Sequence, residues 1–184
     1  MGIKARHVLG IDASTHTLAF CFMEDGVPQW WGEVDLGTGK DTHTRLGEAF
    51  ASIQAILDST LKDTDHVICY IESAVKINNI KTTINLSYMY GIIIGAIASR
   101  GILVREVSPI TWQNFIGNRS LTPQEKKKIV SENKGLSRST VNNKIRKFRK
   151  QRTINWVKET FDIELESNNV SDSFGISHFG AYHG

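Results

Sequence analysis

The sequence predicts an α/β protein in which a mixed five-stranded sheet is flanked by helices. Three apolar segments within residues 8–36 have the composition of strands and are separated by small residues after Asp12 and by Gly26. Two further apolar runs, Val67–Glu72 and Leu103–Val107, each follow a segment with helical periodicity. An antiparallel meander followed by alternating helices and strands is typical of one α/β domain with a mixed sheet.

The predicted helices rest on periodicity and on capping signals. Residues 42–59 place apolar side chains at spacings of three and four, which indicates an amphipathic helix. Residues 86–99 are apolar on several sides, so that helix must bury more than one face. Thr122, Pro123 and Glu125 form a capping signal for a helix that begins at Pro123. Shorter helices are predicted over 112–116, 139–148, 154–161 and 170–182.

The size and composition fit a single domain of 184 residues, with 40% hydrophobic and 22% charged residues. The longest apolar stretch, residues 92–98, is too short to cross a bilayer, and residues 1–8 lack the apolar run of a signal peptide. We therefore expect no membrane association and a cytoplasmic location. Cys21 and Cys69 lie in apolar runs and are expected to be reduced and buried.

The charge of the chain is concentrated in one segment. Residues 119–152 hold 12 Lys and Arg against 2 acids, a net charge of +10, whereas the remainder carries −7 and the whole chain +3. Such a segment is either a DNA-binding insertion in the domain or a solvated, lysine-rich helical face. Gly135 divides it, so we expect a helical hairpin, with a helix-turn-helix around 135–141 as the alternative.

Carboxylates stand at the ends of predicted core elements. Asp12 ends the first strand, Glu72 ends the fourth, and Asp172 lies in the first turn of the last helix, with Asn169 three residues earlier. Because neighbouring strand ends cluster in a mixed sheet, these side chains can meet at one edge. Each acid also has a structural interpretation, since Asp12 could occupy a turn and Asp172 could cap its helix.

Carboxylates held close together repel one another, and a divalent cation removes that conflict. Hard oxygen ligands suit Mg²⁺ or Mn²⁺. Two such ions about 4 Å apart can activate water and stabilise the departing oxygen in phosphodiester hydrolysis. The sequence therefore predicts Asp12, Glu72, Asn169 and Asp172 as catalytic and metal-binding residues.

Three motifs in order resemble those of the RuvC Holliday-junction resolvases of the RNase H-like superfamily. They are Val8-Leu9-Gly10-Ile11-Asp12, Tyr70-Ile71-Glu72-Ser73, and the segment from Asn169 to Ile176. The resemblance covers nearly the whole chain except the basic insertion, whose length suggests the viral or phage branch and thus the host cytoplasm. It implies an RNase H-like fold and a crossover junction endodeoxyribonuclease with two metal ions. It also implies a homodimer that nicks four-way junctions symmetrically, and residues 86–97 are our candidate for the dimer contact.

Two positions depart from the family pattern. Asn169 stands where the family usually has an acid or a histidine, and it brings no negative charge to a second ion. It is either natural variation or a substitution that lowers activity and traps an uncleaved complex, and both interpretations remain open. Val75 replaces the aromatic residue that often follows the glutamate, so base stacking is not expected there.

Branched DNA is the expected partner, bound through its phosphates more than through its bases. Lys76 and Lys81 follow Glu72 and are either close to the scissile strand or solvated loop residues. Two other functions stay open, namely junction binding without cleavage and a nuclease for RNA or RNA–DNA hybrids. The remaining candidate DNA-binding residues are Lys126, Lys127, Lys128, Arg138, Lys144, Arg146, Lys147, Arg149, Lys150 and Arg152.

Overall fold

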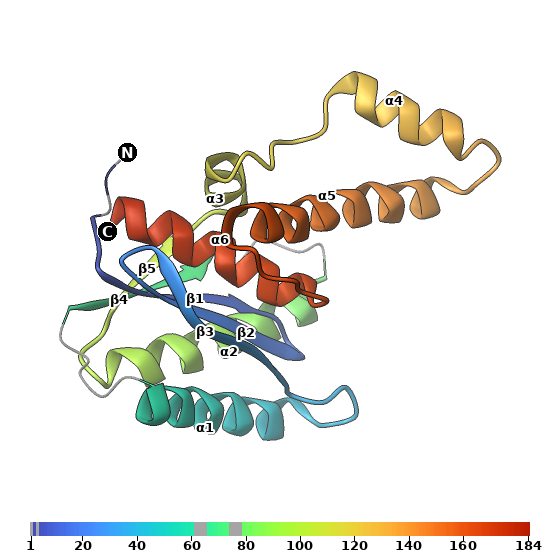
Figure 1. Cartoon of the computed structure of the whole chain (residues 1–184). Helices are drawn as coiled ribbons and strands as arrows, with labels where there is room; N and C mark the ends of the chain where they lie inside the picture. Colours follow the sequence, from blue (N-terminus) through green and yellow to red (C-terminus); the bar gives the residue numbers. More distant parts are fainter. Residues whose placement is uncertain (1, 3, 61–65, 74–78) are drawn as a thin grey trace.

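A five-stranded sheet with helices on both faces forms the body of the protein (Figure 1). The computed structural model describes residues 2, 4–60, 66–73 and 79–184. In the sheet the strand order is β3-β2-β1-β4-β5, in which β1, β2 and β3 pair antiparallel and β1, β4 and β5 pair parallel. The predicted mixed sheet is confirmed. The strands are β1 (His7–Ala13), β2 (Thr17–Glu24), β3 (Val27–Asp35), β4 (Val67–Glu72) and β5 (Leu103–Val107).

Helices cover the sheet and extend beyond it. Figure 1 shows α1 and α2 on one face and α6 on the other, with α4 and the outer half of α5 projecting from the body as a hairpin. In the part of the chain that the structure describes, no helix is long and apolar enough to cross a membrane. The helices are α1 (Thr42–Thr60), α2 (Ile80–Ala98), α3 (Pro109–Phe115), α4 (Pro123–Glu132), α5 (Arg138–Phe161) and α6 (Asn168–His183).

Helix α2 begins at Ile80, six residues before the predicted start. The side chain of Asn79 accepts hydrogen bonds from the backbone N–H groups of Lys81 and Thr82, at 3.0 and 3.3 Å. These bonds satisfy donors that have no partner within the helix, so Asn79 sets the start. The prediction was wrong because it followed the apolar residues and overlooked this cap.

Helix α5 is continuous, so the prediction of separate helices over 139–148 and 154–161 was wrong. Ser137 caps its first turn by accepting from the N–H of Thr140 at 3.2 Å. No glycine or proline interrupts residues 138–161, and Thr153 and Val157 are buried against the body. The outer half of α5 and α4 therefore form the predicted hairpin on a helix that is anchored in the core.

The two faces of β1 serve different purposes. Leu9 and Ile11 point into the main hydrophobic core with α1 and α2, where Ile53 and Ile93 are also buried. Because side chains alternate along a strand, Asp12 lies on the opposite face, which α6 covers. The alternation thus places one carboxylate beneath α6 while its neighbour Ile11 stabilises the core.

Glycine lets α6 lie close to the sheet. A Cβ atom at Gly10 would stand 2.6 Å from the backbone oxygen of Ser173 and 2.6 Å from the backbone nitrogen of Ser177. A Cβ atom at Gly180 would meet the ring of Tyr70 at 2.5 Å. Such contacts are too short for real atoms, so these positions require glycine, and the close approach brings the first half of α6 to the end of β1.

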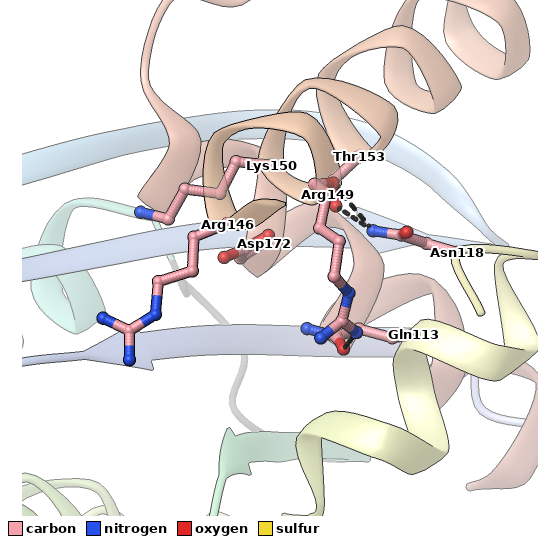
Figure 2. A pocket seen from close by; sticks show the side chains of 7 residues that line it. All are labelled: Gln113, Asn118, Arg146, Arg149, Lys150, Thr153 and Asp172. Atoms are coloured by element: carbon pink, nitrogen blue, oxygen red, sulfur yellow. Dashed lines mark hydrogen bonds between the residues drawn. The ribbon is translucent and has the colours of Figure 1, made fainter. Parts of the chain in front are cut away.

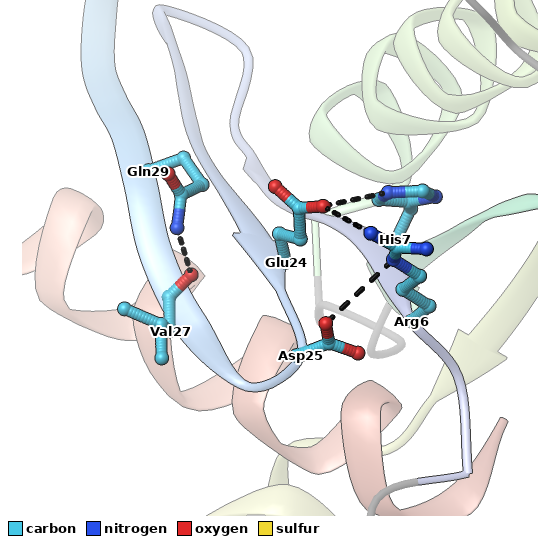
Figure 3. Close-up of polar contacts among 6 residues, drawn as sticks. All are labelled: Arg6, His7, Glu24, Asp25, Val27 and Gln29. Carbon is cyan, nitrogen blue, oxygen red and sulfur yellow. Dashed lines mark hydrogen bonds and ion pairs between the residues drawn. The ribbon is translucent and has the colours of Figure 1, made fainter.

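Charged residues at the opposite end of β1 are paired (Figure 3). Arg6 donates to Glu24 at 3.0 Å, its Nε lies 3.6 Å from Asp25, and His7 lies 3.4 Å from Glu24. The hydrogen bond from Arg6 lowers the pKa of Glu24 below its ordinary value. Carboxylates at this end are thus neutralised by neighbouring side chains, in contrast to those beneath α6.

Candidate active site

Asp12 has a desolvated carboxyl group near the end of β1. Its register partner on β2 is Ala19, which is buried against Val170 and Phe174 of α6. Desolvation, followed by the negative charges of Asp172 and Glu72, raises the pKa of Asp12 well above its ordinary value, with Lys150 acting in the opposite direction. Burial and the neighbouring negative charges thus both disfavour the ionised form of Asp12 in the metal-free protein.

Glu72 ends β4, the strand parallel to β1. Its carboxylate accepts a hydrogen bond from the indole N–H of Trp112 at 2.7 Å, and its backbone oxygen accepts one from the hydroxyl of Tyr90. Trp112 is fully buried, so it holds Glu72 in a defined orientation. Burial raises the pKa of Glu72, and the hydrogen bond from Trp112 partly offsets that rise.

Asp172 lies in the second turn of α6 and does not cap the helix. Ser167 is the cap, since its hydroxyl accepts from the N–H of Val170 at 3.3 Å. Burial first, and then the charge of Glu72, raise the pKa of Asp172 to about 7, although Lys150 lowers it. The structural interpretation of Asp172 as a helix cap is therefore wrong.

The three acids converge from β1, β4 and α6 onto one site. Asp172 and Glu72 both raise the pKa of Asp12, and Glu72 raises that of Asp172, so their charges interact across a desolvated space. Within residues 4–60, 66–73 and 79–184, however, no three His, Cys, Asp or Glu side chains are already close enough to hold an ion together. A bound cation would have to draw the carboxylates inward against their repulsion.

Asn169 faces β3 from the first turn of α6. Its side-chain N–H groups lie 3.1 Å from Oε2 of Glu33 and 3.3 Å from the hydroxyl oxygen of Thr17. Because they are three positions apart in the sequence, Asn169 and Asp172 share one side of the helix. Asn169 thus lies one turn before Asp172, with its amide nitrogen directed toward Glu33 and Thr17.

Glu33 lies beside these residues and was not among the predicted site residues. Asp12 pairs with Ala19 and Ala19 pairs with Glu33, so all three lie in one row across β1, β2 and β3 on one face of the sheet. Glu33 also contributes to the raised pKa of Asp12. The alternation of Trp31 and Glu33 along residues 29–36 is the sequence signal that could have placed it beneath α6.

Basic residues of α5 surround Asp172 at the mouth of the site (Figure 2). A pocket of about 170 Å³ is lined by Asp172 and by Arg146, Arg149 and Lys150, and the two arginines lie on either side of Asp172 in Figure 2. The guanidinium of Arg149 donates to Gln113 of α3. Cationic side chains thus stand next to the desolvated carboxylates.

The other basic candidates lie farther along the hairpin or outside it. Arg152 is 3.7 Å from Glu125 and joins α5 to α4, so its charge is partly neutralised. Lys81 is exposed in the first turn of α2, while Lys76 and Val75 lie outside the described residues. The remaining candidates are exposed on the hairpin, namely Lys126, Lys127, Lys128, Arg138, Lys144 and Lys147.

Removing Asp172 is expected to change how stability depends on pH. A folded-state pKa of about 7 exceeds the unfolded value near 4, so this group stabilises the metal-free protein most below pH ~4. That contribution is lost as the pH rises through about 7. We therefore expect Asp172→Asn to raise the melting temperature relative to the unchanged protein at pH 8 more than at pH 5, both measured in EDTA.

His178 contributes an opposite slope in both proteins, since burial lowers its pKa to about 4. Only the difference between the two melting curves is therefore diagnostic of Asp172. Equal differences at pH 5 and pH 8 would show that the Asp172 carboxyl group is not desolvated in solution. Adding Mg²⁺ should stabilise the unchanged protein more than Asp172→Asn.

The strand order and the helices on both faces of the sheet define an α/β protein with an RNase H-like fold, in which Asp12 and Glu72 lie near the ends of the neighbouring strands β1 and β4. Solved structures with a similar fold extend over nearly the whole chain. RuvC from T. thermophilus in complex with a Holliday junction substrate has a TM-score of 0.69 and 11% identity, covering 96% of this chain and 94% of that chain. Another Thermus thermophilus RuvC structure has a TM-score of 0.66 and 12% identity over the same shares.

The yeast mitochondrial Holliday junction resolvase Ydc2 has the same fold with a TM-score of 0.53 and 12% identity, covering 97% of this chain and 78% of that chain. No family model matches this chain, and neither does any curated protein sequence. The comparisons therefore establish a RuvC-like fold.

Proposed function

We propose that this protein is a metal-dependent endonuclease that resolves four-way DNA junctions. The observation that carries the proposal is the convergence of Asp12, Glu72 and Asp172, from distant parts of the chain, beside the basic face of α5. A cation would relieve the repulsion between the desolvated acids, and a polyanion would bind the dense set of cationic side chains. The likeness of the fold to that of RuvC, one structure of which holds a Holliday junction substrate, supports the choice of branched DNA.

Asp12, Glu72 and Asp172 would hold Mg²⁺ or Mn²⁺, with the amide oxygen of Asn169 as a neutral ligand. The fit rests on the desolvation and mutual repulsion of these carboxylates, which a divalent cation would relieve. When bound, a pair of such ions supplies a water nucleophile and stabilises the leaving oxygen. The indole of Trp112 orients Glu72 for this role by donating its hydrogen bond.

Arg146, Arg149 and Lys150 would bind the phosphates that flank the scissile bond. Spacings of three and four residues place these side chains on one side of α5, the side that also lines the pocket at Asp172. Backbone phosphates held there would be fixed relative to the carboxylates, since α5 is anchored in the core by Thr153 and Val157. Cutting would then depend on the shape of the junction more than on its sequence.

The decisive experiment incubates the purified protein with a labelled four-way junction in Mg²⁺ or Mn²⁺. We expect paired nicks on opposing strands, and faster nicking after Asn169→Asp if the neutral amide limits binding of a second ion. Tight junction binding without cleavage by either protein would favour a non-catalytic junction-binding function. Preferential cleavage of an RNA–DNA hybrid would favour a nuclease for hybrids. Either outcome would contradict the proposal.

The proposal includes a homodimer formed through α2. Met89, Tyr90 and Ile93 face the core, whereas Ile84 and Tyr88 are 45% and 54% exposed. An almost wholly apolar pocket between α1 and α2 continues this exposed surface. A second copy of the chain is the partner that symmetric cutting of two opposing strands requires. The lining residues of the pocket are His43, Leu46, Ser87, Tyr88, Gly91 and Ile92.

Gly91→Arg is expected to convert the dimer into a monomer without unfolding it. A Cβ atom at Gly91 meets nothing within 4 Å, so the arginine is tolerated within one chain but places a charge in the proposed contact. Light scattering should give about twice 20.6 kDa for the unchanged protein and 20.6 kDa for the variant. Gly39→Arg, at a position equally free of contacts, is the control and should stay dimeric. A dimeric Gly91→Arg protein would exclude this surface.

The viral or phage branch, and with it action in the host cytoplasm, is part of the proposal. It is supported by the length of the basic segment, which occupies all of α4 and more than half of α5. A hairpin of this size gives the chain a DNA-binding element outside the sheet and the layer of helices that covers it (Figure 1).

A further inference from the structure

Glu33 lies on the same face of the sheet as Asp12, two strands away. The row Asp12, Ala19 and Glu33 crosses β1, β2 and β3 in register, and Ala19 has no side chain long enough to separate the two acids. Adjacent strands lie about 4.8 Å apart, so the backbones of β1 and β3 are about 10 Å apart at this row. A glutamate side chain on β3 can therefore reach toward the first turn of α6.

Glu33 contacts Asn169, the one neutral residue of the proposed metal site. Its Oε2 atom accepts hydrogen bonds from the amide nitrogen of Asn169 at 3.1 Å and from the hydroxyl of Ser167 at 2.6 Å. An ionised carboxylate can only accept, so the amide of Asn169 must present its nitrogen to Glu33. Because the amide is planar, its carbonyl oxygen then faces away from Glu33.

We infer that Glu33 is a positioning residue that turns Asn169 into an effective metal ligand. A hydrogen bond from an amide N–H to a carboxylate is charge-assisted, and it polarises the amide so that the carbonyl oxygen becomes more negative. Carboxylates behind metal-bound histidines act in the same way, by fixing the orientation of the ligand and raising its basicity. The carboxylate of Glu33 thereby supplies negative charge next to Asn169, whose own side chain is neutral.

This inference rests on the proposed function, because it assigns a role in the same metal site. The positioning role of Glu33 differs from a purely structural role, in which Glu33 would only stabilise the start of α6 through Ser167. A structural role predicts that loss of Glu33 lowers the melting temperature and leaves metal affinity unchanged. A positioning role predicts a loss of metal affinity that depends on residue 169.

A double-mutant cycle between Glu33 and Asn169 tests the inference through Mn²⁺ binding, measured by calorimetry on the full chain. Loss of a group that orients a metal ligand lowers affinity about 10- to 100-fold. We therefore expect Glu33→Gln to weaken Mn²⁺ binding by at least about tenfold. In the Asn169→Asp background we expect the same substitution to have little effect or to strengthen binding, because two carboxylates about 3 Å apart repel one another.

Glu24→Gln removes an equal charge at the other end of the β2–β3 hairpin and should leave Mn²⁺ affinity unchanged (Figure 3). Thermal melts establish that each variant is folded, and Glu33→Asp, which keeps the charge but shortens the side chain, replaces Glu33→Gln if the latter unfolds. Equal effects of Glu33→Gln in both backgrounds, or none in either, would overturn the inference while leaving the nuclease proposal intact. A protein that neither binds Mn²⁺ nor cuts junctions would overturn both.

Discussion

Asp12→Asn is expected to abolish junction cleavage while the protein still folds and binds DNA. Asparagine has nearly the same shape as aspartate but removes the charge that interacts with both Asp172 and Glu72. Metal ions contribute several kcal/mol to the stabilisation of a phosphoryl transition state, and each 1.4 kcal/mol corresponds to a factor of ten. We expect the single-turnover rate on a labelled four-way junction to fall about 10³-fold.

Asp25→Asn provides a matched control, since Asp25 lies at the opposite end of the β1–β2 pair and asparagine tolerates its positive φ of 49°. The control should cut at the unchanged rate. The metal-free Asp12→Asn protein should melt no lower than the unchanged protein, because the substitution removes a desolvated charge. A cleavage rate within about tenfold of normal would contradict a catalytic role for Asp12.

Replacing Arg146, Arg149 and Lys150 together by alanine is expected to lower DNA affinity more than replacing three basic residues elsewhere on the protein. All three line the pocket beside Asp172, where each can contact a phosphate. Each phosphate contact contributes about 0.9 to the slope of log affinity against log salt, so the slope should become shallower by roughly 2.7. Affinity for a four-way junction should fall roughly 100-fold at moderate salt, as measured by fluorescence anisotropy over a salt series.

The matched control replaces Lys4, Arg6 and Arg100, which line a pocket at the other end of the sheet. It removes the same number of positive charges, so it separates local contacts from the effect of net charge. The control should lower affinity only slightly and leave the salt slope nearly unchanged. Equal losses for the two triple variants would mean that DNA does not lie along α5.

Much of the fold follows from local patterns in the sequence. The strands were predicted because each is a short apolar run between turn residues such as Gly26. Such a run can be recognised from local composition alone, without knowledge of the residues that pack against it. The extent of α5 was not predicted, because apolar periodicity fades where Arg149 and Lys150 follow Phe148. Helical continuity at that point comes from the absence of a breaker and from the burial of Thr153 and Val157 against the body.

Some residues of the candidate site could likewise be predicted from local sequence, whereas others depend on the tertiary structure. Asp12 and Glu72 were found because each stands at or next to the last residue of a strand, and strand ends cluster at one edge of a sheet. Glu33 was not found, because its approach to Asn169 depends on the register between β2 and β3, and register is a property of pairing that a single strand does not reveal. Trp112 was taken only as an apolar residue of a short helix, although its indole N–H orients Glu72.

The unbroken course of α5 restricts how the length of the hairpin can vary between related proteins. Each residue advances an α-helix by about 100°, so one extra residue between Lys150 and Val157 would swing the cationic side chains away from Asp172. A change in length at the turn formed by residues 133–137 would not rotate these side chains, because the turn is far from Thr153 and Val157, the residues of α5 that are buried against the body. Natural insertions and deletions should therefore accumulate at this tip, while the root of the helix keeps a constant length.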